Sequence, residues 1–327
     1  MIVAYFEEKI LTPQTISAEN QVLLKEAIWI DLLCPSRDEE RLIERQLNLD
    51  IPTREEMSEI ELSSRLYKNN HGVLFMTATM LAQSDSAEPK YDAVTFILTG
   101  QQLITLRYIE PQSFRLFTSQ LQKLEMVNHH ALTVFIELLN ATVDRLADIL
   151  EIISHHLDEH SKTIFQPQPM QHTAVNIDYH LLMQQIGMNA DINTKVRESL
   201  VSFSRLIIFL GQSAGSKIDI DGQLSGLVTL SKDIASLSEH ANFISNKVNF
   251  LLDATLGMVS IEQNKIIKIF SVAAVIFLPP TLIASIYGMN FRFMPELTWH
   301  GGYLFAISLM LLSAWLPYKY FKRRKWL

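Results

Sequence analysis

Polar and small side chains recur at alternating steps of three and four residues toward the C-terminal end of the sequence. A step that alternates in this way keeps every member on one face of a helix. The series begins with a carboxylate, is small or apolar in its middle and ends with hydroxyls. Its members are Asp253, Gly257, Ser260, Asn264, Ile267, Ser271, Ala274, Leu278, Thr281, Ser285 and Gly288, with Phe270 beside Ser271.

Two interpretations of this stripe are open from its spacing alone. Polar groups inside a membrane are costly unless they meet protein or water. A stripe with a carboxylate at one end and hydroxyls deep in an apolar segment therefore suits the lining of an ion pore. Small side chains in the same pattern also allow membrane helices to pack closely. One hairpin of helices cannot enclose a pore, so the first interpretation requires several copies of the chain around a rotation axis.

The stripe runs through the first of two apolar segments. Residues 269–287 and 301–318 form runs of 19 and 18 residues without a charged side chain. Each run is close to the roughly 20 residues that a helix needs to cross a bilayer. Pro279 and Pro280 lie within the first run, where membrane helices tolerate proline. We therefore expect a two-helix membrane hairpin.

Basic residues predict the orientation of this hairpin. Lys265 and Lys268 precede the first run, and five further basic residues follow the second run between positions 319 and 325. The connecting segment 288–300 carries no net charge. Because basic residues favour the cytoplasmic side, both termini should be cytoplasmic. The start of the sequence lacks the pattern of a signal peptide, so we expect no cleaved leader.

The preceding residues predict a soluble α/β domain joined to a long helix. Short β-rich runs are interrupted by a charged helix, in which Ser36 and Glu39 are spaced as in a capping box. The runs are Ile2–Phe6, Ile28–Leu33, Gly72–Leu81, Tyr91–Leu98 and Gln102–Arg107, and the helix lies near Ser36–Leu47. The expected soluble part consists of a cytoplasmic α/β domain (1–112) and a cytoplasmic helical region (113–221). A stalk helix (222–288) follows and becomes the first membrane helix at about 267–288. The remainder is an extracytoplasmic loop (289–300), a second membrane helix (301–320) and a basic cytoplasmic tail (321–327).

A second helical stripe on the stalk is predominantly apolar. Its period of 3.5 residues keeps one seam against neighbouring helices, and we interpret it as ordinary helix packing. The seam consists of Leu227, Leu230, Ile234, Leu237, Ala241, Ile244, Val248, Leu251, Thr255 and Met258.

Charge and composition exclude several classes of function. Residues 1–264 carry 20 basic and 34 acidic side chains, a balance that repels nucleic acid and attracts cations. Cys34 is the one cysteine, so an internal disulfide is impossible. No nucleotide-binding or metalloprotease motif occurs. We therefore expect neither enzymatic activity nor an organic cofactor.

The segment 261–297, IEQNKIIKIFSVAAVIFLPPTLIASIYGMNFRFMPEL, resembles the CorA family of magnesium and cobalt transporters. The family's signature is Gly-Met-Asn after an aromatic residue, here at 287–290, followed by Met-Pro-Glu-Leu at 294–297. The resemblance implies a cone-shaped homopentamer in the bacterial inner membrane. It also implies passive influx of Mg²⁺, with Co²⁺ and Ni²⁺ as further cargo, driven by the membrane potential and gated by intracellular Mg²⁺.

The same resemblance assigns roles to particular residues. It places the selectivity filter at Gly288, Met289 and Asn290, and an acidic ring at the cytoplasmic mouth at Asp253. The outer loop departs from the family, because Arg292 stands where relatives often place an acidic residue, which leaves Glu296 to attract cations. The implied pore positions are Asn264, Ile267, Phe270, Leu278 and Thr281, and most of them lie on the stripe found from its period.

Some features remain open. Asp85 and Asp233 are candidates for the regulatory Mg²⁺ site. The histidines at 155, 156 and 160 suit either a solvated helix face or metal binding, and they mildly favour an alternative, a zinc transporter of the same superfamily. A further alternative from another class is a membrane-tethered oligomeric receptor that conducts nothing. The bilayer, divalent cations and other copies of the chain are the expected partners.

Overall fold

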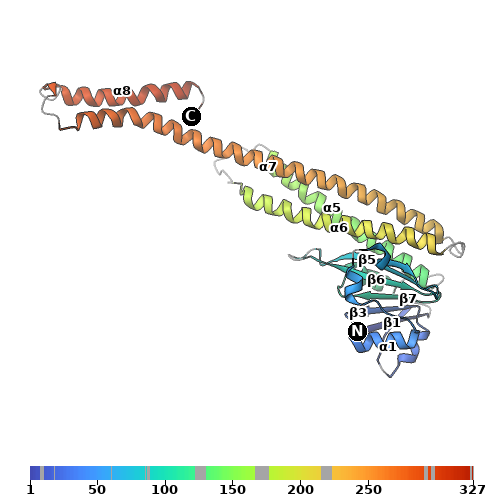
Figure 1. Ribbon diagram of the computed structural model, residues 1–327. Coiled ribbons are helices and arrows are strands. Elements are labelled where there is room, and N and C mark those ends of the chain that lie inside the picture. Colours follow the sequence, from blue (N-terminus) through green and yellow to red (C-terminus); the bar gives the residue numbers. More distant parts are fainter. Residues whose placement is uncertain are drawn as a thin grey trace. The chain divides into compact units, whose positions relative to one another are not determined.

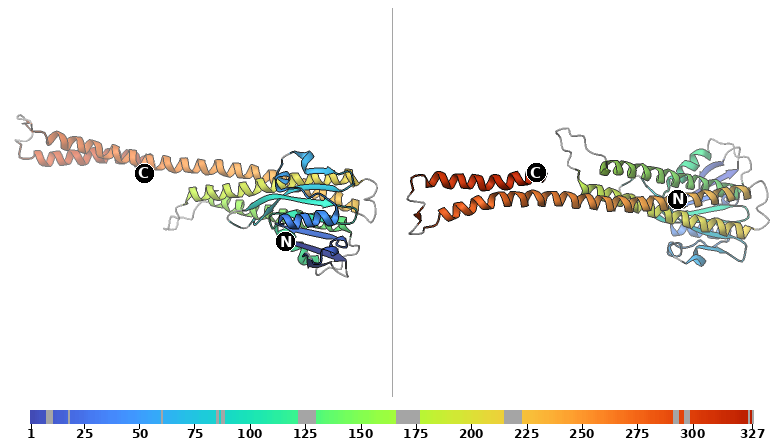
Figure 2. Two further views of the ribbon diagram at one scale, coloured as in Figure 1. Left: turned by 60° about the horizontal axis from the view of Figure 1, so that its bottom comes forward. Right: turned by 90° about the horizontal axis from the view of Figure 1, so that it is seen from above.

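The computed structural model describes residues 1–7, 11–17, 19–59, 61–84, 86, 89–121, 130–165, 177–214, 223–290, 294–295, 299–324 and 326. They form two compact units, Met1–Leu252 and Asp253–Leu327, and each unit is described by itself. Figures 1 and 2 show the elements of both units from three directions.

The first unit is built on a seven-stranded sheet with the order β2-β1-β3-β7-β6-β5-β4. The central strands β3 and β7 are parallel, and the other neighbouring strands pair antiparallel. The expected strands are all present, whereas the short strands β2 and β4 were not predicted. The strands are β1 (Ile2–Glu7), β2 (Leu11–Thr15), β3 (Trp29–Leu33), β4 (Leu66–Lys68), β5 (Leu74–Ala82), β6 (Lys90–Leu98) and β7 (Leu103–Arg107).

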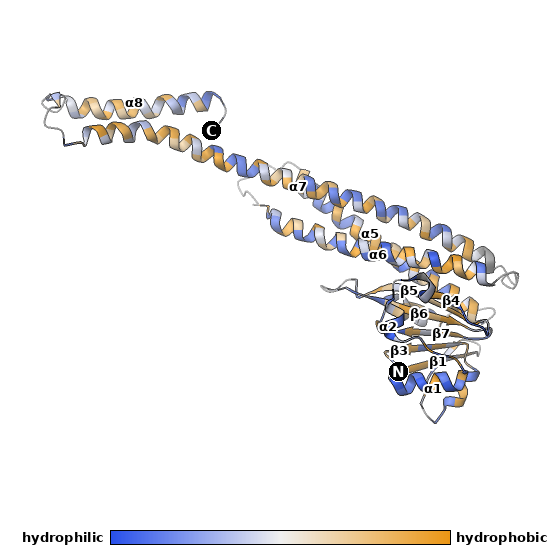
Figure 3. Cartoon of the chain, in the orientation of Figure 1, coloured by the Kyte–Doolittle hydropathy of each residue, from blue (hydrophilic) through white to orange (hydrophobic). Residues whose placement is uncertain are grey.

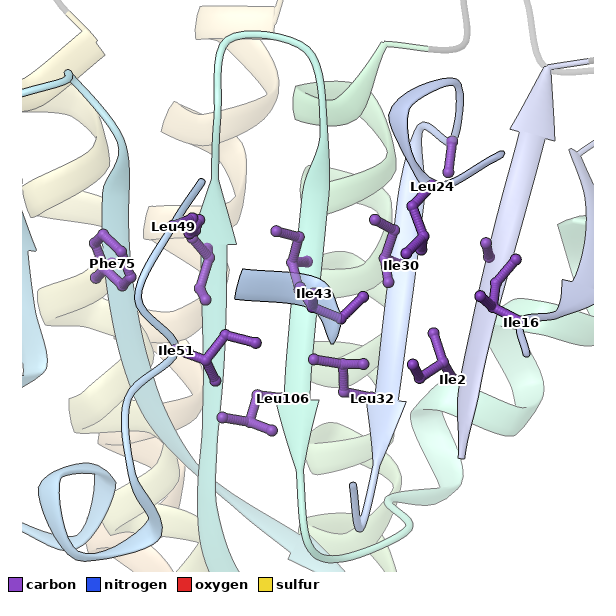
Figure 4. Close-up of a cluster of buried hydrophobic side chains, with 14 of the residues drawn as sticks. Ile2, Ile16, Leu24, Ile30, Leu32, Ile43, Leu49, Ile51, Phe75 and Leu106 are labelled. Carbon is purple, nitrogen blue, oxygen red and sulfur yellow. The ribbon is translucent and has the colours of Figure 1, made fainter. Parts of the chain in front are cut away.

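One face of the sheet packs against helix α1 (Arg37–Leu47). Ile43 of this helix is fully buried among aliphatic side chains of β1, β3 and β7 (Figure 4). The predicted capping box is confirmed, because Ser36 N donates to Glu39 Oε2 at 2.8 Å and Glu39 N donates to Ser36 Oγ at 3.3 Å. Short elements flank this core: η1 (Gln21–Lys25), α2 (Arg54–Ser58) and α3 (Leu62–Arg65).

The other face of the sheet packs against α4 (Gln112–Leu121), α5 (Ala131–Phe165) and α6 (Tyr179–Ala214). Because strand side chains alternate between faces, residues 29 and 31 of β3 point to this side together with residues 105 and 107 of β7. Trp29 stacks on Tyr5 with ring centroids 4.3 Å apart, and it also contacts Phe114 and Phe117 of α4.

A buried ion pair joins the two parallel strands on this face. Arg107 Nη2 lies 2.7 Å from Asp31 Oδ2, and Arg107 Nε donates to Asp31 Oδ1 at 3.0 Å. Thr105 donates its hydroxyl to the same carboxylate at 2.7 Å and accepts the indole N–H of Trp29 at 3.0 Å. The guanidinium also lies 4.5 Å from the centroid of the Phe114 ring. These bonds compensate both charges for their loss of water.

Helix α7 (Gln223–Tyr287) is continuous through Pro279 and Pro280, as predicted for the stalk and the first membrane helix. Within the first unit, its apolar seam is buried. Asn193 of α6 supports this packing, since its amide donates to Ala241 O at 3.0 Å and to Ser245 Oγ at 2.9 Å. The buried seam residues of this unit are Leu227, Leu230, Ile234, Ala241, Ile244, Val248 and Leu251.

The second unit contains the end of α7 and helix α8 (Gly302–Arg323), which lie side by side as a hairpin (Figures 1 and 2). Both helices are long and apolar enough to cross a membrane. Figure 3 shows that the colouring of α7 changes from alternating polar and apolar residues to predominantly apolar residues in this unit. The α/β fold, the long helix and the C-terminal pair of apolar helices therefore agree with the predicted fold class.

Candidate functional site

The predicted pore stripe is exposed along its whole length. All of its members lie on the part of α7 that belongs to the second unit, or directly after it. The large apolar members are among the most exposed side chains of the chain: Ile267 is 61% exposed, Leu278 66% and the neighbouring Phe270 71%. Within the described residues, helix α8 does not cover this face.

A different face of α7 is turned toward α8. Val272 is 1% exposed, and Ile276 and Ile283 are half-buried on the same side. On α8, the small residues Gly302 and Ala306 are buried, as expected where two membrane helices approach closely. At about 100° per residue, the centre of the stripe lies roughly 140° around the helix from the face that packs on α8. The hairpin thus leaves the stripe free for another subunit or for water.

The predicted selectivity motif follows the last turn of α7. The helix ends at Tyr287, and the Gly288 N–H closes the final turn on Ala284 O at 2.9 Å. A Cβ atom on residue 288 would lie 3.1 Å from the same carbonyl oxygen, so a larger residue would crowd this carbonyl. Met289 N donates to Ile286 O at 3.2 Å, and Asn290 is exposed just beyond. The motif is therefore presented at a helix end, where backbone carbonyls lack helical partners.

Deeper in the first membrane helix, two prolines interrupt the hydrogen-bond ladder. Pro279 and Pro280 carry no N–H, so two carbonyls one turn earlier lose their usual donors. Thr281 donates its hydroxyl to Phe277 O at 2.7 Å. This bond ties up the hydroxyl proton, while the oxygen keeps its lone pairs as acceptors.

The opposite end of the hairpin contains a contact that the sequence analysis missed. The Lys268 ammonium lies 5.1 Å from the centroid of the Trp326 ring, and Trp326 also stacks on Phe321. The basic ending was interpreted only as an orientation signal, although its single tryptophan is a good partner for a cation. Lys268 lies between Ile267 and Phe270 in the sequence.

Of the two candidates for metal regulation, Asp233 lies within the described residues. Asp233 is exposed on α7 of the first unit, close to Asp144 and Asp148 of α5. Burial raises the pKa of Asp144, and the charges of Asp148 and Asp233 raise it further. Asp144 and Asp148 were not predicted, although their spacing of four residues places both on one face of a helix. Asp85 lies outside the described residues, as do Arg292 and Glu296.

The three histidines lie on α5, but they do not form one cluster. His155 pairs with Glu159, with 3.4 Å between Nε2 and Oε1. His156 and His160 instead line a cavity beside α6. Within the described part of the chain, no group of three or more histidine, cysteine, aspartate or glutamate side chains is arranged to hold a metal ion.

Known proteins resemble this chain over nearly its full length. The magnesium transport protein CorA of Escherichia coli K12 is 37% identical over 309 residues, which cover 94% of each chain. The solved structure of the CorA magnesium transporter from Methanocaldococcus jannaschii matches with a TM-score of 0.75 and 16% identity, covering 100% of this chain and 99% of that one.

Another solved structure matches a smaller part of this chain. The cytoplasmic domain of ZntB from Vibrio parahaemolyticus has a TM-score of 0.59 and 12% identity, covering 80% of this chain and 98% of that domain. At such identities, the two solved structures establish the fold alone. The sequence profile of the family described as CorA-like Mg2+ transporter protein matches residues 25–323, and with the relative at 37% identity this shows that the chain belongs to the CorA family.

Proposed function

We propose that this chain is a subunit of a channel that carries Mg²⁺ passively across a bacterial inner membrane. One observation supports the proposal above the others: the exposed stripe of α7 ends at the Gly-Met-Asn motif. The names of the relatives specify magnesium transport, and a stripe uncovered within its own chain is what a pore built by several chains requires. No catalytic step is part of this function.

A homopentamer would place five copies of the stripe around one axis. Mg²⁺ gives up its water reluctantly, so a filter of neutral oxygens suits it better than a cage of carboxylates. The Asn290 amides and Gly288 carbonyls would hold the hydrated ion through its water, with Met289 between them. Asn264, Ser271, Thr281 and Ser285 would offer further oxygens along the path.

Gating would depend on the apolar members of the stripe. Rings of Ile267, Phe270 and Leu278 would exclude water from the closed pore and block a hydrated ion. Ala274 is small and would leave a wider section between these rings. Asp253 would form the acidic ring at the cytoplasmic mouth, where carboxylates concentrate cations.

Direction and driving force follow from the proposed orientation. With both termini in the cytoplasm, the Gly-Met-Asn motif faces outward and Mg²⁺ meets it first. A membrane potential contributes about 4.6 kcal/mol per 100 mV to the entry of a doubly charged ion. Such a channel needs no nucleotide.

Regulation by intracellular Mg²⁺ would act through the acidic first unit. Asp233 and its neighbours Asp144 and Asp148 repel one another, as the raised pKa of Asp144 reflects together with burial. A divalent cation bound there would relieve that repulsion and favour the packing of α5 against α7. A cation can shift the gating equilibrium only if it binds the closed state more tightly.

Mg²⁺ influx into proteoliposomes tests the channel itself. We expect uptake by the wild type and loss of selective uptake by Asn290→Ala with the oligomer still assembled. Ser260→Ala is a matched control, since Ser260 lies on the same stripe but away from the filter. Normal Mg²⁺ uptake by Asn290→Ala would contradict the proposed filter, and absence of flux from an assembled wild type would favour the receptor alternative.

The zinc alternative is tested in the same vesicles. The histidines of α5 and the fold shared with ZntB are the observations that favour it. If Zn²⁺ uptake exceeds Mg²⁺ uptake at equal concentration, the zinc-transporter alternative is correct. Co²⁺ and Ni²⁺ should be carried along with Mg²⁺.

A further inference from the structure

A cavity of about 680 Å³ lies between α5, α6 and the segment that follows β5. Isoleucines of both helices form much of its wall, while polar side chains gather on one side. None of these residues belongs to the pore stripe or to the acidic group around Asp233. The polar members are Ser84, Ser86, His156, Glu159, His160, Gln185 and Asn189.

Two imidazoles of this cavity are spaced for joint binding of one ion. His156 and His160 are four residues apart on α5, so they lie one turn apart on the same face. Pairs of histidines with this helical spacing are a recurrent way to bind Zn²⁺. His155 belongs to the outer surface of the helix instead, where it pairs with Glu159.

Asn189 lies beside one ring nitrogen of His156. Its side-chain amide donates to Gln185 O at 3.1 Å, which turns its Oδ1 toward His156 Nδ1 at 3.5 Å. When Nδ1 carries the proton, it can donate to this oxygen, and Nε2 then keeps a free lone pair. Metal-binding histidines characteristically donate their second nitrogen to a carbonyl oxygen in this way.

His160 is suited to the same role. It lines the cavity one helical turn from His156 and is half-buried there.

We propose that His156 and His160 bind one transition-metal dication, such as Ni²⁺, Co²⁺ or Zn²⁺, with water completing its coordination. Imidazole nitrogens suit these ions, whereas Mg²⁺ prefers oxygen ligands. With no third histidine, cysteine or carboxylate arranged around an ion among the described residues, the site is open and exchanges its metal readily. It is distinct from the transport path, because none of its residues lies on α7.

Metal binding by the full-length protein tests this site without any measurement of transport. The protein, with its purification tag removed, is held in detergent with excess Mg²⁺ so that oxygen sites are filled. Ni²⁺ is then titrated by calorimetry, and Co²⁺ binding is followed by visible absorption. We expect one Mg²⁺-resistant site per chain in the wild type, and at least a tenfold weaker affinity in the His156→Ala/His160→Ala variant.

The neighbouring histidine supplies the matched control. His155→Ala removes an imidazole from the same helical turn but not from the cavity, so it should bind Ni²⁺ like the wild type. Unchanged binding in the double variant would overturn the proposal, and so would an equal loss in His155→Ala. Displacement of Ni²⁺ by Mg²⁺ would also overturn it, since oxygen ligands would then be responsible. The helical circular-dichroism signal checks that each variant is folded.

Discussion

Helix α7 contributes to both units, and the residues that it exposes differ between its two parts. In the first unit, Leu230 and Ile244 are 2% and 0% exposed, and the outward-facing residues are mostly polar, with Phe243 and Phe250 as exposed exceptions. In the second unit, large apolar residues such as Phe277, 69% exposed, face outward, and the buried positions of the hairpin include the small residues Gly302 and Ala306. The same secondary structure is therefore adapted to water in one part and to lipid in the other.

The two units also differ in whether their polar side chains find hydrogen-bond partners within the same chain. In the first unit, the buried Asp31 carboxylate is satisfied within its own chain by Arg107 and Thr105. In the second unit, Asn264 and Ser285 are exposed on the stripe, in a segment suited to a membrane. The buried Asp31 carboxylate of the first unit is thus satisfied within one chain, whereas the polar residues of the stripe are exposed in the second unit.

The largest effect is expected where a buried charge loses its partner. Arg107→Leu leaves the Asp31 carboxylate in a site where its side chain is 6% exposed. Breaking a buried pair from one side costs about 3–5 kcal/mol, so the free energy of unfolding of the first unit should fall by that amount. Denaturant unfolding of the detergent-solubilised protein measures the change.

A double variant separates the charge from the packing. In Arg107→Leu/Asp31→Asn, the uncompensated charge is gone, so much of the lost stability should return. If the double variant is as unstable as Arg107→Leu, the effect comes from lost packing of the guanidinium on Phe114, and the electrostatic argument fails.

Two isoleucines of α7 give the next comparison. Ile244→Ala creates a cavity at a fully buried seam position and should lower the free energy of unfolding by about 2–5 kcal/mol. Ile267→Ala removes a side chain that is 61% exposed in the single chain, so it should leave the first unit unchanged. Its expected effect is a higher Mg²⁺ leak in proteoliposomes, because a proposed apolar constriction is widened. Equal destabilisation of the first unit by both variants would contradict the division into two units.

Much of this fold could be predicted because its strongest signals are periodic. The apolar seam of α7, the two uncharged runs and the capping box at Ser36 are each encoded within a short stretch of sequence. Strands β2 and β4 were missed because they are short and at the edges of the sheet, where their side chains alternate weakly. The pairing of β3 with β7 depends on contacts between residues more than seventy positions apart, which periodicity does not report.

The candidate site was predicted unevenly for a similar reason. The stripe lies on one helix, so its spacing places every member. Asp144 and Asp148 could be recognised as candidate residues only from the structure, because α5 packs beside α7 at Asp233. Asn189 could be recognised only because α6 places it beside His156. Interactions between helices require the tertiary structure, whereas interactions within a helix do not.

The N-terminal caps of the helices also differ between the two units, and a smaller effect is expected from changing them. Helix α1 begins with the Ser36 cap, whereas α8 begins at Gly301 without a side-chain cap. Ser36→Ala should cost about 0.5–2 kcal/mol of stability in the first unit, measured by denaturant unfolding. Thr53→Ala at the equivalent cap of α2 is a matched variant that should behave alike. No effect from either variant would mean that water satisfies these N–H groups equally well.

The smallest effect is expected from the acidic residues between α5 and α7. Asp144 holds its proton more tightly in the folded chain than in the unfolded chain, because burial and the charges of Asp148 and Asp233 raise its pKa. Its ionised form therefore lowers stability above the folded pKa, and this cost disappears as the pH falls below about 4, the pKa of an unfolded aspartate. Asp233→Asn should accordingly stabilise the first unit slightly at pH 7, within the ~0.2–1 kcal/mol typical of exposed charge pairs.

Mg²⁺ distinguishes simple repulsion from a regulatory site at Asp233. If a cation binds there, millimolar Mg²⁺ should slow proteolysis of the first unit in the wild type and protect Asp233→Asn less. Asp191→Asn is the control, since Asp191 pairs with Lys195 at 2.7 Å and its loss should not stabilise the protein at pH 7. Equal protection of the wild type and Asp233→Asn would remove Asp233 from the regulatory site. The pH-dependent stabilisation would remain, because it depends on the repulsion among the three carboxylates and not on a bound ion.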